Sequence, residues 1–291
     1  MEAVLHLRSI KLTDKWVANR LPKRPKDANK GTFGKILVVA GSENFPGAAY
    51  LASAASYRIG AGLVTLATEP SVKMIVSRKL PEVTFLSRDE VFGKIDEYDV
   101  LLIGPGLGQS GEALNLVKQI LSKELPLMVI DGDGLNILSK LGEWWKRLDD
   151  EIILTPHPGE MARLTGLTVD EIQKDRVSAA QNFAKKWNQV VVLKGANTII
   201  VSPTGELLVS PFANPTLATA GTGDVLAGII AGLLAQGLKP FDAAGVGVYI
   251  HGMAGDKLRE KTGNTGALAN ELLPLLPLAI YFLTKDYNSR K

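Results

Sequence analysis

The sequence lacks cysteine and any long apolar run, and both absences narrow its function. With no cysteine among its 291 residues, the chain has no disulfide, no thiolate nucleophile and no metal site with cysteine ligands. No apolar run is long enough to cross a bilayer, and the first residues, MEAVLHLRSIKLTDKW, have no continuous apolar core of the kind that a secretory signal needs. We therefore expect a cytoplasmic protein with no membrane partner.

Aromatic residues are also few, and the excess of basic charge is confined to one end. Aromatics make up 6% of the chain, while residues 1–35 carry nine Lys or Arg against three Asp or Glu, a net charge of +6. A nucleic-acid site would interleave such basic residues with aromatic side chains, and nothing further along the chain supports one. We therefore interpret residues 1–30 as a basic N-terminal arm or linker and expect no nucleic-acid partner.

The rest of the chain, residues 31–291, is typical of a single α/β domain. Hydrophobic residues make up 46% of the sequence, enough for a sizeable core. Short apolar runs break repeatedly into glycine, proline and polar residues, as in KILVVAG, DVLLIGPGLG, LMVIDGDGLN, EIILTPHPGE and VVVLKGANT. Helical patterns separate these runs, which predicts a layered α/β fold with a mostly parallel sheet and helices on both faces.

Two segments refine this prediction. The segment TVDEIQKDRVSAAQNFAKKW has an apolar stripe at helical spacing, and Thr168 and Glu171 have the spacing of a capping box. NTIIVSPTGELLVS has two alternating runs joined by SPTG, which predicts a hairpin at the edge of the sheet. The last hundred residues are expected to be mainly helical.

The stretch TAGTGDVLAG, residues 219–228, is the strongest candidate for chemistry. Its glycines allow backbone N–H groups to approach a ligand closely, and the helix that follows favours an anion at its N-terminus. Asp224 in the first turn could be a simple partner of the helix dipole. A carboxylate beside a phosphate site would repel the phosphate, however, unless it handles the proton of the attacking group. Together these features indicate phosphoryl transfer.

Other strand ends carry polar residues that admit two interpretations each. GPGLGQSG, residues 104–111, is either a structural turn or a place where backbone lies close to a ligand. Asp131 and Asp133 could hold Mg²⁺ through water or cap the next helix. His157, between two prolines, is more typical of a ligand contact than of a core residue. Lys194 could meet a phosphate or lie at a solvated strand end. All should meet at the carboxyl edge of the sheet.

The order of these motifs resembles one family. KGTFG, AGSENFPGAA, IGPGLG, IDGDGLN, LTPHPGEMARLTG, VVLKGANT and GTGDVLAG follow one another from Gly31 to about Leu273. This order is similar to that of the ADP-dependent NAD(P)H-hydrate dehydratases of the ribokinase-like superfamily. The resemblance implies a three-layer sandwich and a repair enzyme that dehydrates hydrated NADH or NADPH (NADHX or NADPHX). ADP or ATP would be the phosphoryl donor, with Mg²⁺, and AMP and phosphate would be the products when ADP is used.

The resemblance also implies roles for particular residues. Asp224 would be the catalytic base and a substrate contact, within an anion hole formed by Gly221, Thr222 and Gly223. The further substrate contacts would be Ala48, Gly106 and His157. The nucleotide contacts would be Lys194, Gly195, Ala196, Asn197, Thr198 and Gly223. No motif identifies the metal ligands.

The resemblance implies partners as well. Many members of the family carry a fused NAD(P)H-hydrate epimerase, and others work with a separate one; a homotetramer is also expected. Two alternatives remain open: a small-molecule alcohol kinase of the same superfamily, and a nucleotide-sensing protein that has kept the fold and lost the chemistry.

Overall fold

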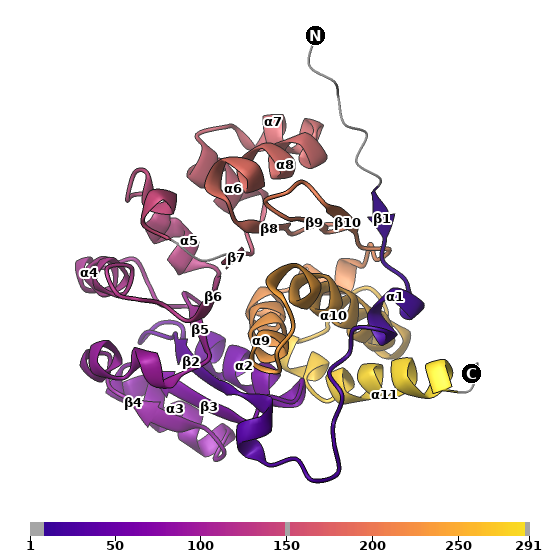
Figure 1. The fold of residues 1–291 in the computed structure, drawn as a ribbon, viewed down its shortest axis with the longest axis horizontal. Coiled ribbons are helices and arrows are strands. Elements are labelled where there is room, and N and C mark those ends of the chain that lie inside the picture. Colours follow the sequence, from indigo (N-terminus) through magenta and orange to yellow (C-terminus); the bar gives the residue numbers. More distant parts are fainter. Residues whose placement is uncertain (1–8, 149–151, 289–291) are drawn as a thin grey trace.

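The strands of the structure, a computed structural model that describes residues 9–148 and 152–288, form one sheet (Figure 1). In chain order they are β1 (Ile10–Lys11), β2 (Lys35–Val39), β3 (Leu63–Ala67), β4 (Thr84–Leu86), β5 (Val100–Ile103), β6 (Leu127–Ile130), β7 (Ile153–Leu154), β8 (Val190–Leu193), β9 (Ile199–Val201) and β10 (Leu207–Val209). Their order across the sheet is β1-β10-β9-β8-β7-β6-β5-β2-β3-β4. The run from β8 to β4 is parallel throughout, as the apolar strand patterns predict.

Helices connect and cover these strands. The α-helices are α1 (Asp14–Ala18), α2 (Pro46–Arg58), α3 (Pro70–Lys79), α4 (Gly111–Ile120), α5 (Asp133–Leu138), α6 (Pro158–Thr165), α7 (Val169–Lys174), α8 (Arg176–Trp187), α9 (Thr222–Ala235), α10 (Pro240–Thr262) and α11 (Leu275–Asn288). The 3₁₀ helices are η1 (Lys30–Phe33), η2 (Asp89–Gly93), η3 (Ile95–Glu97), η4 (Trp144–Arg147), η5 (Pro215–Leu217) and η6 (Ala269–Leu272). Among the described residues, no helix combines the length and apolarity needed to cross a membrane.

Successive strand residues divide the core into two layers. Ile36 and Val38 of β2 belong to a cluster with α2, α9, α10 and α11, whereas Leu37 and Val39 belong to a cluster with α4, α5 and α8. This alternation is the period of two that a strand imposes on its side chains. Helices therefore cover both faces of the sheet, and the predicted mostly parallel three-layer α/β architecture is confirmed.

Two local features differ from the sequence expectation. The predicted hairpin forms, with β9 and β10 antiparallel. It does not lie at the edge of the sheet, however, because β1 pairs with β10 and is the edge strand on that side. The helical stretch after Thr168 is divided at Asp175, whose carboxylate accepts a hydrogen bond from the N–H of Ser178 and caps α8. The capping box of Thr168 and Glu171 is present at the start of α7, as predicted.

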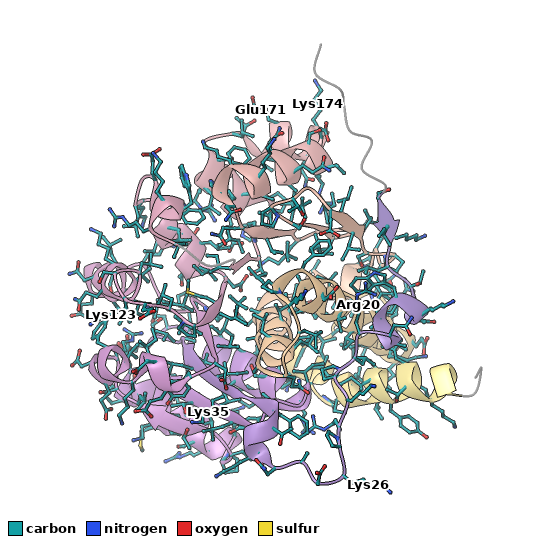
Figure 2. All side chains as sticks on the ribbon, viewed as in Figure 1. Arg20, Lys26, Lys35, Lys123, Glu171 and Lys174 are labelled. Atoms are coloured by element: carbon teal, nitrogen blue, oxygen red, sulfur yellow. The ribbon has the colours of Figure 1, made fainter. Side chains whose placement is uncertain are left out.

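The described part of the N-terminal segment packs on the domain. Leu12 and Val17 are buried in the core, and Arg20 forms an ion pair with Asp242 at the start of α10 (2.8 Å). The labelled side chains of Lys26, Lys123 and Lys174 lie at the periphery of the molecule (Figure 2). Residues 1–8 of the predicted arm lie outside the described residues, and the division of the chain at residue 30 stays a prediction.

Candidate active site

The N-terminus of α9 forms one wall of the site. Gly221 precedes the helix with φ = 91°, a left-handed conformation that glycine adopts without strain. The hydroxyl of Thr222 donates to the carbonyls of Leu217 (2.7 Å) and Thr219 (2.9 Å), which fixes the turn. Within the described residues no side chain caps this helix. The positive end of its dipole is therefore available to an anion, as the sequence predicts.

Asp224 lies in the first turn of α9 in an environment that disfavours its charge. Burial raises the pKa of its carboxyl group to about 7, and repulsion by Asp131 and Glu160 adds to the effect, while Lys194 opposes it. An acid with a pKa near neutrality can accept a proton and release it at physiological pH. This environment suits a general base.

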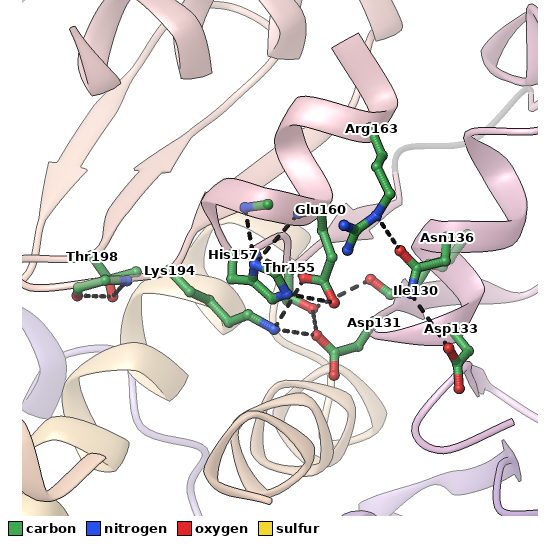
Figure 3. Close-up of polar contacts among 12 residues, drawn as sticks. Ile130, Asp131, Asp133, Asn136, Thr155, His157, Glu160, Arg163, Lys194 and Thr198 are labelled. Atoms are coloured by element: carbon green, nitrogen blue, oxygen red, sulfur yellow. Dashed lines mark hydrogen bonds and ion pairs between the residues drawn. The ribbon is translucent and has the colours of Figure 1, made fainter. Parts of the chain in front are cut away.

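Lys194 connects the ends of three strands (Figure 3). It follows β8, and its ammonium donates to Oδ1 of Asp131 after β6 at 2.7 Å and lies 3.6 Å from Oε2 of Glu160. The hydroxyl of Thr155, after β7, donates to the same Asp131 oxygen (2.6 Å). Although burial lowers it, the pKa of Lys194 is raised by the neighbouring carboxylates, so this lysine keeps its charge. A Cβ on Gly223 would lie 3.4 Å from the lysine Nζ, which places the ammonium at the start of α9.

His157 is the N-cap residue of α6. Its Nδ1 accepts a hydrogen bond from the N–H of Gly159 (3.0 Å), so the neutral ring carries its proton on Nε2. Glu160 completes a capping box by accepting from the N–H of His157 (2.8 Å). Burial, with Lys194 nearby, lowers the pKa of the imidazole. The ring is therefore neutral at pH 7 and is half exposed. Its Nε2 lies 3.5 Å from Oε1 of Glu160, beyond a good hydrogen bond, so it can donate to a ligand.

The GPGLG turn after β5 packs on the start of α2. Gly106 has φ = 57°, and a Cβ there would lie 2.7 Å from the Cβ of Ala48. The hydroxyl of Ser42 donates to the Gly106 carbonyl (2.9 Å), and Asp133 accepts from the N–H of Gly108 (2.9 Å). These bonds fix the turn and bring Gly106 and Ala48 together.

Neither of the two aspartates after β6 caps the helix that follows. Asp131 pairs with Lys194, and Asp133 holds the GPGLG turn rather than capping α5, whose N-cap is Gly132. Among residues 9–148 and 152–288, no group of three His, Asp or Glu side chains is arranged to hold a metal ion.

The segment Lys194–Thr198 forms a loop braced by Arg176 at the start of α8. The guanidinium of Arg176 donates to the carbonyls of Ala196 (2.6 Å) and Leu193 (2.9 Å). Asn197 has φ = 52°, and its side chain donates to the carbonyl of Ser210 (3.0 Å). The hydroxyl of Thr198 donates to the Gly195 carbonyl (2.9 Å). These bonds hold the backbone of the loop in one conformation.

The sequence analysis missed Arg176 and Thr155 as parts of this site. Thr155 directly precedes the PHP motif at a strand end, which is a signal that could have been used. Arg176 carries no such signal, because it lies in a helical stretch and its importance depends on contacts with residues that follow it by about 20 positions.

A parallel α/β sheet whose strand ends bring together a half-buried acid, a lysine and an open helix N-terminus is typical of phosphate-handling enzymes. Comparison with known proteins narrows this class. Residues 36–278 match the family described as NAD(P)H-hydrate dehydratase, and the chain belongs to this family. Its fold is the ribokinase-like one that the resemblance implied.

Individual relatives agree with this assignment. The chain is 40% identical to the ADP-dependent (S)-NAD(P)H-hydrate dehydratase of Neisseria meningitidis, over 86% of each chain. It is 40% identical to the bifunctional NAD(P)H-hydrate repair enzyme of Moorella thermoacetica, over 98% of this chain and 56% of that protein. It therefore spans about half the length of the bifunctional relatives.

A solved structure is also similar. The ADP/ATP-dependent NAD(P)H-hydrate dehydratase of Bacillus subtilis, co-crystallised with ATP and Mg²⁺, is 33% identical and superposes with a TM-score of 0.84, over 95% of this chain and 99% of that one.

Proposed function

We propose that this protein repairs hydrated nicotinamide cofactors by dehydrating the (6S) hydrates of NADH and NADPH, with ADP as phosphoryl donor. The observation that carries the proposal is the placement of Asp224, a half-buried carboxyl group with a pKa of about 7, at an open helix N-terminus beside Lys194. Family membership and the relatives' names support the substrate and the donor.

In the first step Asp224 takes the proton of the ring hydroxyl as the hydroxyl oxygen attacks the terminal phosphorus of the donor. The bond between that phosphorus and its bridging oxygen breaks, and AMP leaves when ADP is used. The N–H groups of Gly221 and Gly223, with the ammonium of Lys194, hold the transferred phosphoryl group. The N–H of Thr222, which makes a long bond to the Thr219 carbonyl (3.3 Å), completes the anion hole by turning to the phosphoryl group.

In the second step the phosphorylated hydroxyl leaves. The C–O bond breaks with its electrons going to phosphate, and the ring loses one proton from the adjacent carbon. The products are phosphate and the restored dihydronicotinamide. A hydroxyl is a poor leaving group and a phosphate a good one, which explains why a dehydration consumes a nucleotide.

The remaining site residues position the two substrates. Ala48, Gly106 and His157 contact the hydrated cofactor, with the Nε2–H of His157 as a hydrogen-bond donor. Lys194, Gly195, Ala196, Asn197 and Thr198 contact the nucleotide, together with Gly223. All of them lie within residues 31–291, which we propose as the catalytic unit.

We propose that Mg²⁺ accompanies the nucleotide. The surplus of carboxylates over lysine around Asp224 suits a divalent cation, and Mg²⁺ usually binds through phosphates, water and one or two carboxylates rather than a protein cage. Among the described residues, Asp131 makes its hydrogen bonds through Oδ1 only, so its second oxygen would be the protein ligand. The ion would neutralise phosphate charge.

The partners follow from the proposed reaction. The enzyme would work with an NAD(P)H-hydrate epimerase, fused as in the bifunctional relatives or separate. A homotetramer is supported by the exposed apolar side chains of Leu278, Tyr281 and Phe282 on α11, and the mass in solution tests it. A cytoplasmic location follows from the substrate, because reduced nicotinamide cofactors are used there.

The test is to mix the protein with hydrated NADH or NADPH, Mg²⁺ and either ADP or ATP, and to follow the absorbance of the dihydronicotinamide ring. The proposal expects nucleotide-dependent formation of the reduced cofactor. A phosphorylated alcohol that accumulates with no reduced cofactor would favour the small-molecule kinase, and nucleotide binding without turnover would favour the sensing protein.

A further inference from the structure

Phe45 is a large apolar side chain left 54% exposed at the strand ends that form the site. Its backbone is fixed: its N–H donates to the Ser42 carbonyl (2.8 Å), and Pro46, the next residue, begins α2. The loop that holds it is also tied to the GPGLG turn, because the N–H of Gly41 donates to the Pro105 carbonyl (2.9 Å). An exposed phenyl ring on a rigid backbone can bind an apolar ligand with little loss of conformational freedom.

Phe45 lies at one end of a wall formed by α2. Residues 45, 48 and 51 follow one another at intervals of three and share a face of the helix, along which six residues span about 9 Å. A Cβ on Gly106 would lie 2.7 Å from the Cβ atoms of both Phe45 and Ala48. The outer end of the wall therefore adjoins the GPGLG turn.

The inner end of the wall reaches Asp224. A Cβ on Gly221 would lie 2.6 Å from Cδ1 of Leu51 and 3.9 Å from Oδ2 of Asp224. α2 runs beside α9, which carries Asp224 in its first turn (Figure 1). The side chains of Leu51, Ala48 and Phe45 thus form a continuous apolar surface that starts at the proposed base and ends at an exposed phenyl ring.

We propose that Phe45 is a positioning residue for the hydrated nicotinamide ring, which lies along this wall with its hydroxyl at Asp224. This inference rests on the proposed function. The reacting part of the substrate is a ring with apolar faces and one hydroxyl, and that hydroxyl must lie within hydrogen-bond reach of Asp224 for its proton to be taken. The wall matches this chemistry, with the acid at one end and apolar side chains beyond.

The experiment compares Phe45→Ala and Phe45→Leu with the unaltered protein. Steady-state rates are measured for hydrated NADH and for hydrated reduced nicotinamide mononucleotide, which lacks the adenylate half, at saturating ADP and Mg²⁺. The KM for ADP is then measured at a saturating concentration of hydrated NADH. Met74→Ala is the matched control, since Met74 is a large apolar side chain 60% exposed on α3. Because Phe45 is exposed, its replacement is expected to leave folding intact, and Phe45→Leu tests this by restoring apolar surface.

The expected result is a KM about tenfold higher for both hydrated substrates in Phe45→Ala, partly recovered in Phe45→Leu, with the KM for ADP unchanged. An unchanged KM for the hydrates would overturn the assignment. So would a rise for the dinucleotide alone, which would place the adenine on Phe45, or an equal rise for ADP, which would indicate a distorted site. Absence of hydrate turnover in the unaltered protein would instead contradict the proposed function itself.

Discussion

Asp224 shares its surroundings with three other acids, Asp131, Glu160 and Asp133, and with one ammonium, that of Lys194. Burial and these acids raise its pKa to about 7, and Lys194 prevents a larger rise. Burial likewise raises the pKa of Glu160 to about 7. Burial and the neighbouring charges, and not the residue type alone, therefore give Asp224 the pKa near neutrality that a general base needs.

Replacing Glu160 with Gln tests this charge placement. The amide still accepts from the N–H of His157 but removes a negative charge that raises the pKa of Asp224. Activity requires ionised Asp224, so it rises with pH through that pKa, and the midpoint of the rise should move to lower pH in Glu160→Gln. The measurement is kcat/KM of hydrate turnover across pH.

Glu171→Gln is the matched control, because Glu171 occupies the same capping-box position in α7 and is exposed. It should leave the midpoint in place. A midpoint that stays fixed or moves to higher pH in Glu160→Gln would show that Glu160 does not act on Asp224 through its charge.

Single residues could be identified from the sequence only where a local motif marks them. Asp224 stands out because an acid beside a glycine-rich turn needs a reason, and His157 because two prolines fix it at a strand end. The pairing of Lys194 with Asp131 joins residues 63 positions apart, so it depends on the sheet order and could not be read from either segment.

At the scale of elements, the loop after β8 depends on the helix before it. The guanidinium of Arg176 at the start of α8 donates to three backbone carbonyls, those of Leu193, Lys194 and Ala196. The guanidinium presents its donors in a rigid planar fork, so they reach these carbonyls from fixed positions, whereas the donors of an ammonium all lie on one atom at the end of a flexible stem. α8 thereby holds the proposed nucleotide loop in one conformation.

Arg176→Lys should therefore raise the KM for ADP about tenfold, with a smaller effect on kcat, since about 1.4 kcal/mol of loop ordering would have to come from the nucleotide. Arg259→Lys is the control, because Arg259 makes an exposed ion pair with Asp256. Equal KM values for ADP in the two variants would show that the contacts of Arg176 with the loop do not contribute to nucleotide binding.

Elements with strong local patterns were predicted well, and those that depend on distant partners were not. The parallel strands, the hairpin and the capping box at Thr168 follow from apolar period, turn residues and cap spacing. β1 has two residues and exists through its pairing with β10, about 200 positions away, so no local pattern could reveal it. The break at Asp175 was hidden because the apolar stripe continues across it.

At the scale of the whole molecule, the half-buried Asp224 should lower the free energy of unfolding when it is ionised. A carboxyl group whose folded pKa is raised contributes stability that is present below its unfolded pKa and is lost as pH rises through the folded value of about 7. Asp224→Asn removes this loss. It should raise the free energy of unfolding by about 2 kcal/mol near pH 8, and the gain should shrink steadily as pH falls toward about 4.

Urea unfolding at several pH values measures this difference. Asp170→Asn is a control at an exposed acid in the first turn of α7 and should show no comparable dependence. A variant Asp224→Asn that is less stable than the unaltered protein at pH 8 would mean that the ionised carboxylate is well compensated in the fold.

The most direct test of the account is the rate at which Asp224→Asn converts hydrated NADH to NADH with ADP and Mg²⁺, measured beside its affinity for ADP. The account predicts a fall in kcat of about a thousandfold or more with ADP affinity nearly unchanged, because the amide cannot accept the hydroxyl proton and the nucleotide loop is untouched. Turnover close to that of the unaltered protein would contradict the assignment of Asp224 as the base.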